Sequence, residues 1–265
     1  MINDILVTST SFVLSENPAW KKLGLNIDFS YVNNLEKGLL SSQNKPVVAL
    51  IFLQDLVDNF SNNNNLNDIS NSITFLINKR LHKNSEPLIV LISKFSFENS
   101  IRRAFDNNKM NKIYEKILKT LRKFQKIKKN LYIIELDYDF SKIGFLNCFD
   151  KRNWYLANCR LSLSGLDELI NSLSKIVLRI NKAPHKVLVL DCDNTLWGGI
   201  VGEDGLEGLD IGQDGLGKAF LDFQKIIKKL KHEGVILAVC SKNNISDVLR
   251  VFTKHKSMFL KKKIF

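Results

Sequence analysis

Long apolar runs are missing from this 265-residue sequence. The longest, Val47–Leu53, has seven residues, whereas a membrane-spanning helix needs about 20. Met1–Leu14 lacks the basic start and apolar core of a secretory signal peptide. We therefore expect no membrane span, no membrane partner and no secretion signal.

Cysteine is scarce, and its positions form neither a CxxC pair nor a disulfide-like framework. The four cysteines are Cys148, Cys159, Cys192 and Cys240. Unpaired thiols are typical of proteins in a reducing compartment. We therefore predict a cytoplasmic protein.

Motifs for nucleotide binding are absent, since the sequence has neither a Walker A segment nor GxGxxG. The net charge of +12 would attract nucleic-acid phosphates, but no aromatic residues interleave with the lysine runs to stack on bases. These runs are Lys126–Lys129, Lys228–Lys231 and Lys261–Lys263. The pattern indicates solvated helix faces and no nucleic-acid partner, and it leaves an anionic substrate or an acidic partner open.

The composition is that of a folded protein, with 45% apolar and 25% charged residues. The first part of the chain alternates short β-branched runs with longer helical patterns, which predicts an α/β fold with a parallel sheet. The predicted strands are Ile5–Thr10, Leu25–Tyr31, Val47–Leu53, Leu88–Ser93 and Leu131–Leu136.

Apolar residues recur every three or four positions in several longer segments, which predicts helices. The clearest are Ile69–Lys83, Asn111–Lys128 and Gly165–Ile180. Ser164 is placed to cap the start of the last one. The polar tract Asn62–Asn65 is a predicted loop, and Asp137–Asn158 has no regular pattern.

A domain boundary is predicted at Asn181–His185, where Pro184 prevents the helix from continuing and an apolar strand follows at once. The predicted domains are residues 1–183 and 184–265. The second one repeats the strand and helix alternation. Its predicted strands and helices are Val187–Asp191, Gly215–His232, Val235–Cys240 and Ile245–His255, with Ile200–Gly212 as a turn or hairpin.

Two carboxylates follow the first strand of the second domain. Asp191 and Asp193 lie in the run VLVLDCDNTLWGG, at the end of an apolar strand that we expect to be buried. Ligands of open α/β sheets bind at such strand ends. Like charges this close disfavour each other, and Mg²⁺, which prefers oxygen ligands shared with phosphate, would relieve the repulsion. The alternative is a turn with two solvent-facing acids.

A hydroxyl group follows the second strand of this domain. The run VILAVCSKN places Ser241 there, and its hydroxyl and the neighbouring backbone N–H groups would donate to a phosphate oxygen. A lone serine at a strand end is more often a turn or cap residue. Its position one helix after Asp191 favours the phosphate-binding interpretation.

Four segments between Lys186 and Met258 carry a specific resemblance: DCDNTLWGG, IVGEDGLEGL, AFLDFQ and LAVCSKN. Their sequence and order resemble the haloacid dehalogenase (HAD) superfamily, and within it the FkbH-like group, also called subfamily IIIC phosphatases. ILVTSTSF, LEKGLL and Trp154–Leu169 more loosely resemble the SGNH-hydrolase-like N-terminal domain of that group. The resemblance implies an SGNH-like three-layer domain with a parallel sheet, followed by a HAD-like Rossmannoid domain.

The resemblance also implies a role for each aspartate. Asp191 would be the nucleophile that forms an aspartyl-phosphate, and Asp193 the general acid and then base. Mg²⁺ would be held by the Asp191 carboxylate and the Asp193 main-chain carbonyl. The substrate would be a small phosphorylated compound, and Ile200–Gly212 a flap that screens the site from water.

The remaining site residues follow from the same motifs. Asn194 and Thr195 would support the loop or the phosphate, and Ser241 and Lys242 would form the second motif. Cys192 would be an acyl-thioester carrier if its thiolate reached the pocket. Strand alternation points its side chain away from both aspartates and favours a buried structural cysteine.

Two departures from these families limit the interpretation. The later HAD motifs, a lysine and an acidic pair, have no match, since no Asp or Glu follows Asp247. We therefore expect an incomplete HAD-like domain with an exposed strand edge, exposed apolar surface and little phosphatase turnover. The first domain has Thr8-Ser9-Thr10-Ser11 where an active SGNH hydrolase has a Gly-Asp-Ser block, and it has no histidine between Asp150 and His185. Ser9 and Ser11 are therefore better explained as residues that end the strand than as nucleophiles.

The sequence is therefore consistent with two functions. The first is an FkbH-like phosphatase or phosphotransferase, which in some members of the group includes glyceryl transfer to an acyl carrier protein. The second is a non-catalytic module that binds an acyl or carrier-protein partner through its first domain. Metal-dependent phosphate release separates the two.

Overall fold

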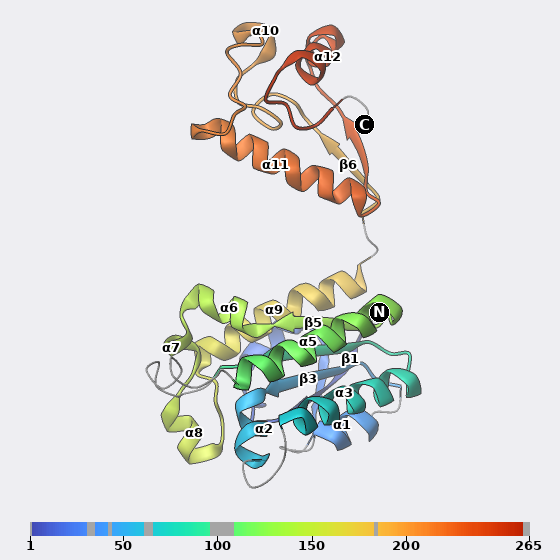
Figure 1. The fold of residues 1–265 in the computed structure, drawn as a ribbon, viewed down its shortest axis with the longest axis vertical. Coiled ribbons are helices and arrows are strands. Elements are labelled where there is room, and N and C mark those ends of the chain that lie inside the picture. The colour runs from blue at the N-terminus through green and yellow to red at the C-terminus, as the bar shows by residue number, and fades with distance from the viewer. Residues whose placement is uncertain are drawn as a thin grey trace. The chain divides into compact units, whose positions relative to one another are not determined.

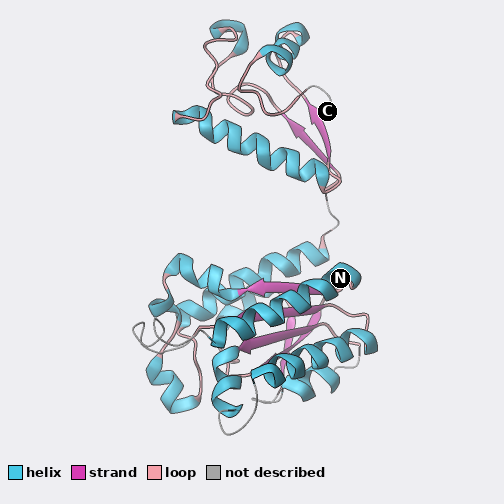
Figure 2. Cartoon of the chain, in the orientation of Figure 1, coloured by secondary structure: helices cyan, strands magenta, loops and turns pink. Residues whose placement is uncertain are grey.

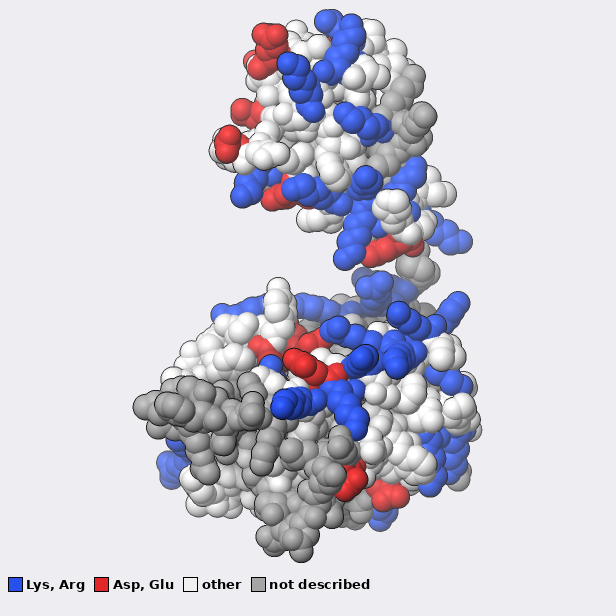
Figure 3. Space-filling view, in the orientation of Figure 1, with Lys and Arg blue, Asp and Glu red and all other residues white. Residues whose placement is uncertain are grey.

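The computed structural model describes residues 2–30, 35–41, 44–60, 66–95, 109–182 and 185–261, so the loop predicted at 62–65 lies outside it. The chain divides into two units, Met1–Lys182 and Ala183–Phe265 (Figure 1). Lys and Arg side chains are spread over both units on the face drawn in Figure 3. In the described part of the chain, no helix is both long and apolar enough to cross a bilayer.

Five parallel strands form the centre of the first unit, in the order β2-β1-β3-β4-β5. They are β1 (Asp4–Ser9), β2 (Asn26–Phe29), β3 (Val47–Phe52), β4 (Leu88–Ser93) and β5 (Leu131–Glu135). Every residue of β3 and β4 is buried, as expected for uninterrupted apolar runs in a sheet covered on both faces. Each predicted strand of this unit is confirmed to within two residues at its ends.

Helices cover both faces of this sheet (Figure 2). One core cluster joins the sheet to η1 (Pro18–Leu23), α6 (Leu136–Ile143) and α9 (Leu163–Asn181). The other joins it to α1 (Leu35–Ser41), α3 (Leu66–Lys83) and α5 (Lys109–Ile127). The first unit is therefore a three-layer α/β fold with a parallel central sheet.

The expectation that Asp137–Asn158 is irregular is wrong. The segment continues α6 and then forms α7 (Phe145–Cys148) and α8 (Lys151–Ala157). Helices of four to eight residues are too short to show a helical repeat of apolar positions, and α8 buries none of its residues. The helix α8 is instead defined by its cap, because the Asp150 carboxylate accepts two backbone N–H groups of its first turn.

The start of α9 also differs from the prediction. The cap is Ser162 and not Ser164, because the Ser162 hydroxyl accepts the N–H of Gly165 at 3.0 Å. Among the described residues before α3, three further short helices were not predicted: η1, α1 and α2 (Leu53–Phe60). Gly38 in α1 lies so close to β1 that an added Cβ would fall 2.3 Å from the Thr8 hydroxyl oxygen, so packing overrides glycine's low helix propensity here.

The second unit is built on two parallel strands, β6 (Val187–Leu190) and β7 (Ile236–Val239), paired from Val187 opposite Ile236 to Leu190 opposite Val239. Its helices are α10 (Val201–Asp204), α11 (Gly215–His232) and α12 (Ile245–Lys254). Gln224 of α11 is fully buried and joins distant segments. Its amide donates to the Leu196 carbonyl at 2.7 Å, and its oxygen accepts the N–H groups of Phe259 and Leu260.

One face of this small sheet is uncovered within the second unit. Val187, Val189 and Ile236 are 51%, 60% and 62% exposed, whereas Leu190 and Leu237 are almost fully buried. The expectation of a buried strand is therefore wrong for one face of β6. The expected exposure of apolar surface is observed on that face.

Substitutions on the two sides of β6 should differ in cost. Leu190→Ala removes a buried side chain and is expected to lower the free energy of unfolding by about 2–5 kcal/mol. Val189→Ala, one residue away on the exposed side, should lower it by less than about 1 kcal/mol. Urea denaturation of the full chain, followed by circular dichroism, measures both changes. Equal losses would show that the Val189 side is covered in solution.

Candidate active site

The loop after β6 presents the first carboxylate to solvent. Asp191 is exposed, and its Oδ1 accepts the N–H of Cys192 at 2.7 Å. Within the described residues, nothing hydrogen-bonds to its second oxygen, Oδ2. One oxygen is therefore held by the loop backbone, and the other is available to a ligand or to a reacting atom.

A tight turn follows Asp191. The N–H groups of Thr195 and Leu196 donate to the Cys192 carbonyl at 3.2 and 2.7 Å. Asn194 has a φ of 52°, a left-handed conformation that asparagine tolerates better than most residues. Its Oδ1 accepts the N–H of Gly199 at 3.0 Å. Asn194 thus shapes the loop, and its side-chain amide group keeps hydrogen-bond donors for a ligand.

Asp193 is held much more tightly than Asp191. Its Oδ1 accepts the indole N–H of Trp197 at 2.9 Å and the backbone N–H of Val201 at 3.3 Å. Its Oδ2 accepts the side-chain amide of Asn243 at 2.7 Å. Three donors from three segments therefore fix the orientation of this carboxylate, and charge-assisted hydrogen bonds of this kind are the stronger ones.

The pairing of β6 with β7 brings the second motif to the first. Leu190 lies opposite Val239, and the N–H of Cys240 donates to the Leu190 carbonyl at 2.9 Å. The strand ends are therefore adjacent, and Ser241 to Asn243 follow beside the aspartate loop. The Ser241 hydroxyl accepts the N–H of Asn243 at 3.3 Å, which shapes the turn that carries Asn243. Lys242 is exposed, and its ammonium forms no hydrogen bond or ion pair with the described residues.

Cys192 points away from both aspartates, into the core of the second unit. It is fully buried beside Leu190, Leu196 and Trp197. The pKa of its thiol is raised to about 11, mainly by burial. A hydrogen bond with Ser241 lowers this pKa, and the negative charges of Asp191 and Asp193 raise it further. The thiolate needed for acyl transfer is therefore strongly disfavoured at neutral pH.

The segment expected to be a turn or hairpin, Ile200–Gly212, combines a helical turn with a hairpin-like closure. It contains α10, and Gly198 exchanges two backbone hydrogen bonds with Asp210, at 3.1 and 2.9 Å. A side chain at Gly198 would collide with Asp210 and Phe220, with Cβ contacts below 3.0 Å. The Asp204 carboxylate accepts the N–H of Ile200 at 2.8 Å and holds the start of the segment.

The sequence reasoning missed two residues of the site, Trp197 and Asn243. Both lie in quoted motifs, but their shared contact with Asp193 depends on the loop turn and on strand pairing. An amide following an apolar strand, next to the predicted phosphate-binding serine, was the available signal for Asn243. From the sequence, Trp197 is predicted to be an ordinary core residue, and no sequence pattern predicts the hydrogen bond that its buried indole makes.

The comparisons with known proteins bear on the fold. No protein-family model and no curated protein matches the chain. Among solved structures, it resembles the N-terminal part of the protein BF1531 from Bacteroides fragilis, containing a phosphatase domain and crystallised in complex with Mg. The TM-score is 0.80 at 24% sequence identity, over 99% of this chain and 74% of that one. The chain therefore shares the overall fold of that structure. At this identity the likeness extends to the fold alone.

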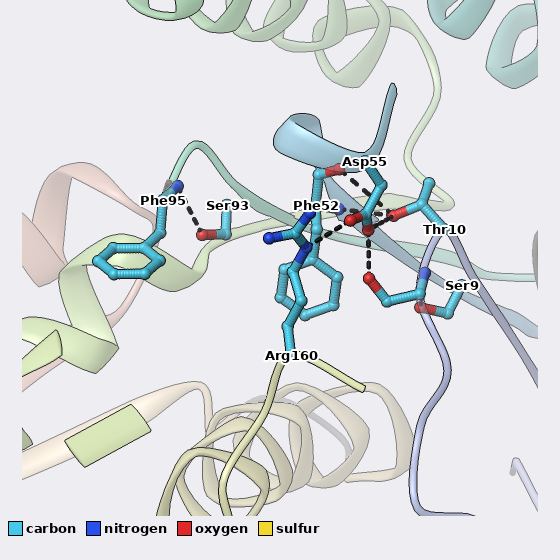
Figure 4. Close-up of polar contacts among 8 residues, drawn as sticks. Ser9, Thr10, Phe52, Asp55, Ser93, Phe95 and Arg160 are labelled. Atoms are coloured by element: carbon cyan, nitrogen blue, oxygen red, sulfur yellow. Dashed lines mark hydrogen bonds and ion pairs between the residues drawn. The ribbon is translucent and has the colours of Figure 1, made fainter. Parts of the chain in front are cut away.

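A second polar cluster lies at the strand ends of the first unit (Figure 4). The buried Asp55 carboxylate, on α2 directly after β3, is paired with the guanidinium of Arg160 and accepts the hydroxyls of Thr10 and Ser11. The Arg160 guanidinium also lies 3.8 Å from the centre of the Trp154 ring. Burial raises the pKa of Asp55, and attraction to Arg160 opposes this rise.

This cluster does not have the arrangement of a serine hydrolase. The Ser11 hydroxyl donates directly to Asp55, and the Ser9 hydroxyl accepts the N–H of Ser11 at 3.2 Å. No histidine hydrogen-bonds to either serine among the described residues. A nucleophilic serine needs a base within hydrogen-bond reach, so the cluster fits a structural role that ties β1, α2 and the Arg160 segment together.

Removing one partner of the buried Asp55–Arg160 ion pair should lower the free energy of unfolding far more than replacing both partners with apolar residues. Asp55→Ala leaves the Arg160 charge buried without its carboxylate and is expected to lower the free energy of unfolding by about 3–5 kcal/mol. The double variant Asp55→Leu/Arg160→Met should recover most of this loss. Urea denaturation of the full chain compares them. A double variant as unstable as Asp55→Ala would contradict a role limited to charge compensation.

The four cysteines should react very unequally in the native protein. Cys240 is exposed, whereas Cys148, Cys159 and Cys192 are buried. Burial raises the pKa of Cys148 and of Cys192 to about 11, so their thiolate fraction stays very small until the pH approaches that value. Iodoacetamide at pH 8, followed by mass spectrometry, should label Cys240 only, and the others after unfolding. Rapid native labelling of Cys192 would restore it as an acyl carrier.

Proposed function

We propose that the second unit is an Mg²⁺-dependent phosphatase site of the FkbH-like kind, with Asp191 as nucleophile. One observation carries the proposal. The exposed Asp191 carboxylate keeps one oxygen free of described partners, and the Asp193 carboxylate, two residues away, is fixed by three hydrogen-bond donors. Both follow β6 where it ends beside its parallel partner β7. The shared fold with a protein that contains a phosphatase domain and was crystallised with Mg supports it.

The geometry suits a two-step displacement on a small phosphorylated compound. Asp191 Oδ2 attacks phosphorus and forms an aspartyl-phosphate, while Asp193, which must enter this step protonated, gives its proton to the leaving alkoxide. Asp193 then takes a proton from water, whose oxygen attacks phosphorus, releases phosphate and restores Asp191. Trp197 and Asn243 hold Asp193 in one orientation through both proton transfers.

The donor set fits Mg²⁺, which takes carboxylate and carbonyl oxygens together with substrate phosphate. The Asp191 carboxylate and the main-chain carbonyl of Asp193 would hold the ion, which when bound would neutralise charge on the transferring phosphoryl group. Within the described residues, no group of three or more metal-ligating side chains comes together. The substrate phosphate and water would therefore supply the other ligands.

Phosphate recognition is proposed for the polar groups around the two strand ends. Ser241 and Thr195 have hydroxyls at the turn, and the Asn194 amide keeps its donors. Lys242 offers an exposed ammonium. These groups are partly or fully exposed, so a substrate would approach them from solvent.

A second candidate function rests on the first unit, which we propose to be SGNH-like in fold and non-catalytic. A hollow of about 180 Å³ opens at the ends of β1 and β2. It is lined by Val7, Phe12, Val13 and Phe29 together with the hydroxyls of Ser9, Ser11, Ser15 and Ser30. Among the described residues, no charged side chain lines it, and the buried Ser30 hydroxyl oxygen finds no hydrogen-bond partner. Such a hollow would accept a short acyl group, presented free or on a carrier protein for glyceryl transfer.

Phosphate release tests the leading proposal. The purified chain with Mg²⁺ is expected to hydrolyse p-nitrophenyl phosphate with low turnover, and both EDTA and Asp191→Asn should abolish this residual activity. Asn243→Ala should lower kcat by about 10- to 100-fold, since Asp193 loses a fixed orientation for proton transfer.

The neighbouring Asn244 provides the matched control. Its side chain makes no capping hydrogen bond and it is exposed, so Asn244→Ala should leave kcat within about twofold of the unchanged chain. Hydrolysis that survives Asp191→Asn would refute the proposed nucleophile. Acyl binding by a chain that releases no phosphate would favour the second function.

A further inference from the structure

The helix α5 concentrates positive charge to an unusual degree. It has seven basic residues and one acidic residue, so its 19 residues carry +6 of the chain's +12. In Figure 3, Lys and Arg side chains gather along the line that α5 follows across the first unit in Figure 1. This local density is independent of the proposed phosphatase site, which lies in the second unit.

The lysines of α5 form one straight stripe. Lys112, Lys116, Lys119, Lys123 and Lys126 are exposed and follow each other at spacings of three or four residues. At about 100° per residue they fall within an arc of about 80° and extend over about 21 Å. The stripe lies opposite the face that packs on the sheet through Ile113, Ile117 and Leu121.

A stripe of like charges weakens a helix, because residues three and four apart are neighbours on its surface. Alternating acids would remove this repulsion, as they do on ordinary solvated helices. Within the described residues, no carboxylate pairs with Lys119, Lys123 or Lys126. Arg122, beside the stripe, is instead paired with Glu135 of β5. The helix therefore tolerates a destabilising charge pattern on the face that is available to a partner.

A hollow lined by charged side chains and Leu118 flanks this stripe and points to the kind of partner. It has a volume of about 380 Å³ and is lined by Glu115, Leu118, Lys119, Arg122, Lys123 and Lys126. Leu118, which is 7% exposed, lines the hollow, and the aliphatic stems of the lysines offer the apolar surface around it. A phosphate backbone would not use such surface, and no aromatic residue lines the hollow to stack on a base. A row of acidic residues beside a row of apolar ones would use both features.

We propose that α5 is a docking surface for an acidic amphipathic helix of a protein partner. Acidic residues of the partner at spacings of three or four would face the lysine stripe, and an apolar side chain would enter the hollow above Leu118. Amphipathic helices that bind in grooves are recognised through side chains repeated at such spacings. Complementary charge would set the orientation and increase the rate of encounter.

The test uses the full chain and a fluorescein-labelled 20-residue helical peptide with a glutamate row and an adjoining leucine row. Binding is followed by fluorescence anisotropy in 50 mM NaCl. Lys119→Gln/Lys123→Gln should weaken binding roughly tenfold, as expected for the loss of two charge pairs of the proposed interface. Serine in place of the peptide leucines should weaken it as well.

The matched control is Lys175→Gln/Lys229→Gln, which removes the same charge from two exposed positions on α9 and α11 and should change affinity less than twofold. Three results would overturn the proposal. The first is equal weakening of peptide binding by both double variants, which would indicate attraction by bulk charge. The second is tighter binding of a 20-nucleotide DNA strand or its duplex than of the peptide, which would indicate a nucleic-acid surface. The third is no peptide binding at 1 mM protein.

Discussion

The parallel pairing of β6 with β7 is the constraint on which the candidate site depends. Its register sets Leu190 opposite Val239 and so places the two strand ends side by side. Asn243 then reaches Asp193 from the second strand end, 50 residues away in sequence, at 2.7 Å. Trp197 reaches the same carboxylate from the loop itself. The carboxylate that we propose as the proton-transfer group is thus oriented by two elements that no local sequence pattern connects.

The two units treat their strand-end carboxylates differently. Asp55 in the first unit is buried, charge-paired with Arg160 and hydrogen-bonded by two hydroxyls, so its oxygens are all engaged with the protein. Asp191 in the second unit is exposed and keeps one oxygen free of described partners. Buried, paired carboxylates stabilise a fold, whereas reactive ones must remain accessible. The contrast explains why the proposed chemistry is assigned to the second unit.

Much of this organisation could be predicted from the sequence. Strands β3 and β4 are apolar runs that each follow a proline and end near polar residues, and α11 has a sustained helical repeat, so their bounds were predicted almost to the residue. Helices of four to eight residues, such as α7 and α8, cannot show such a repeat and were missed. The Asn243 contact depends on strand register, and the exposure of Val187 and Val189 depends on what covers the sheet. Local propensity encodes neither of these.

The central claim is that Asp191 accepts a phosphoryl group beside an Asp193 held in place by Asn243. The most direct measurement is ¹⁹F NMR of the full chain with beryllium fluoride, which mimics a phosphoryl group on a carboxylate, in the presence and absence of Mg²⁺. A protein-bound resonance that requires Mg²⁺ and disappears in Asp191→Asn is the predicted result. No bound resonance at saturating Mg²⁺, or one that persists in Asp191→Asn, would contradict the account.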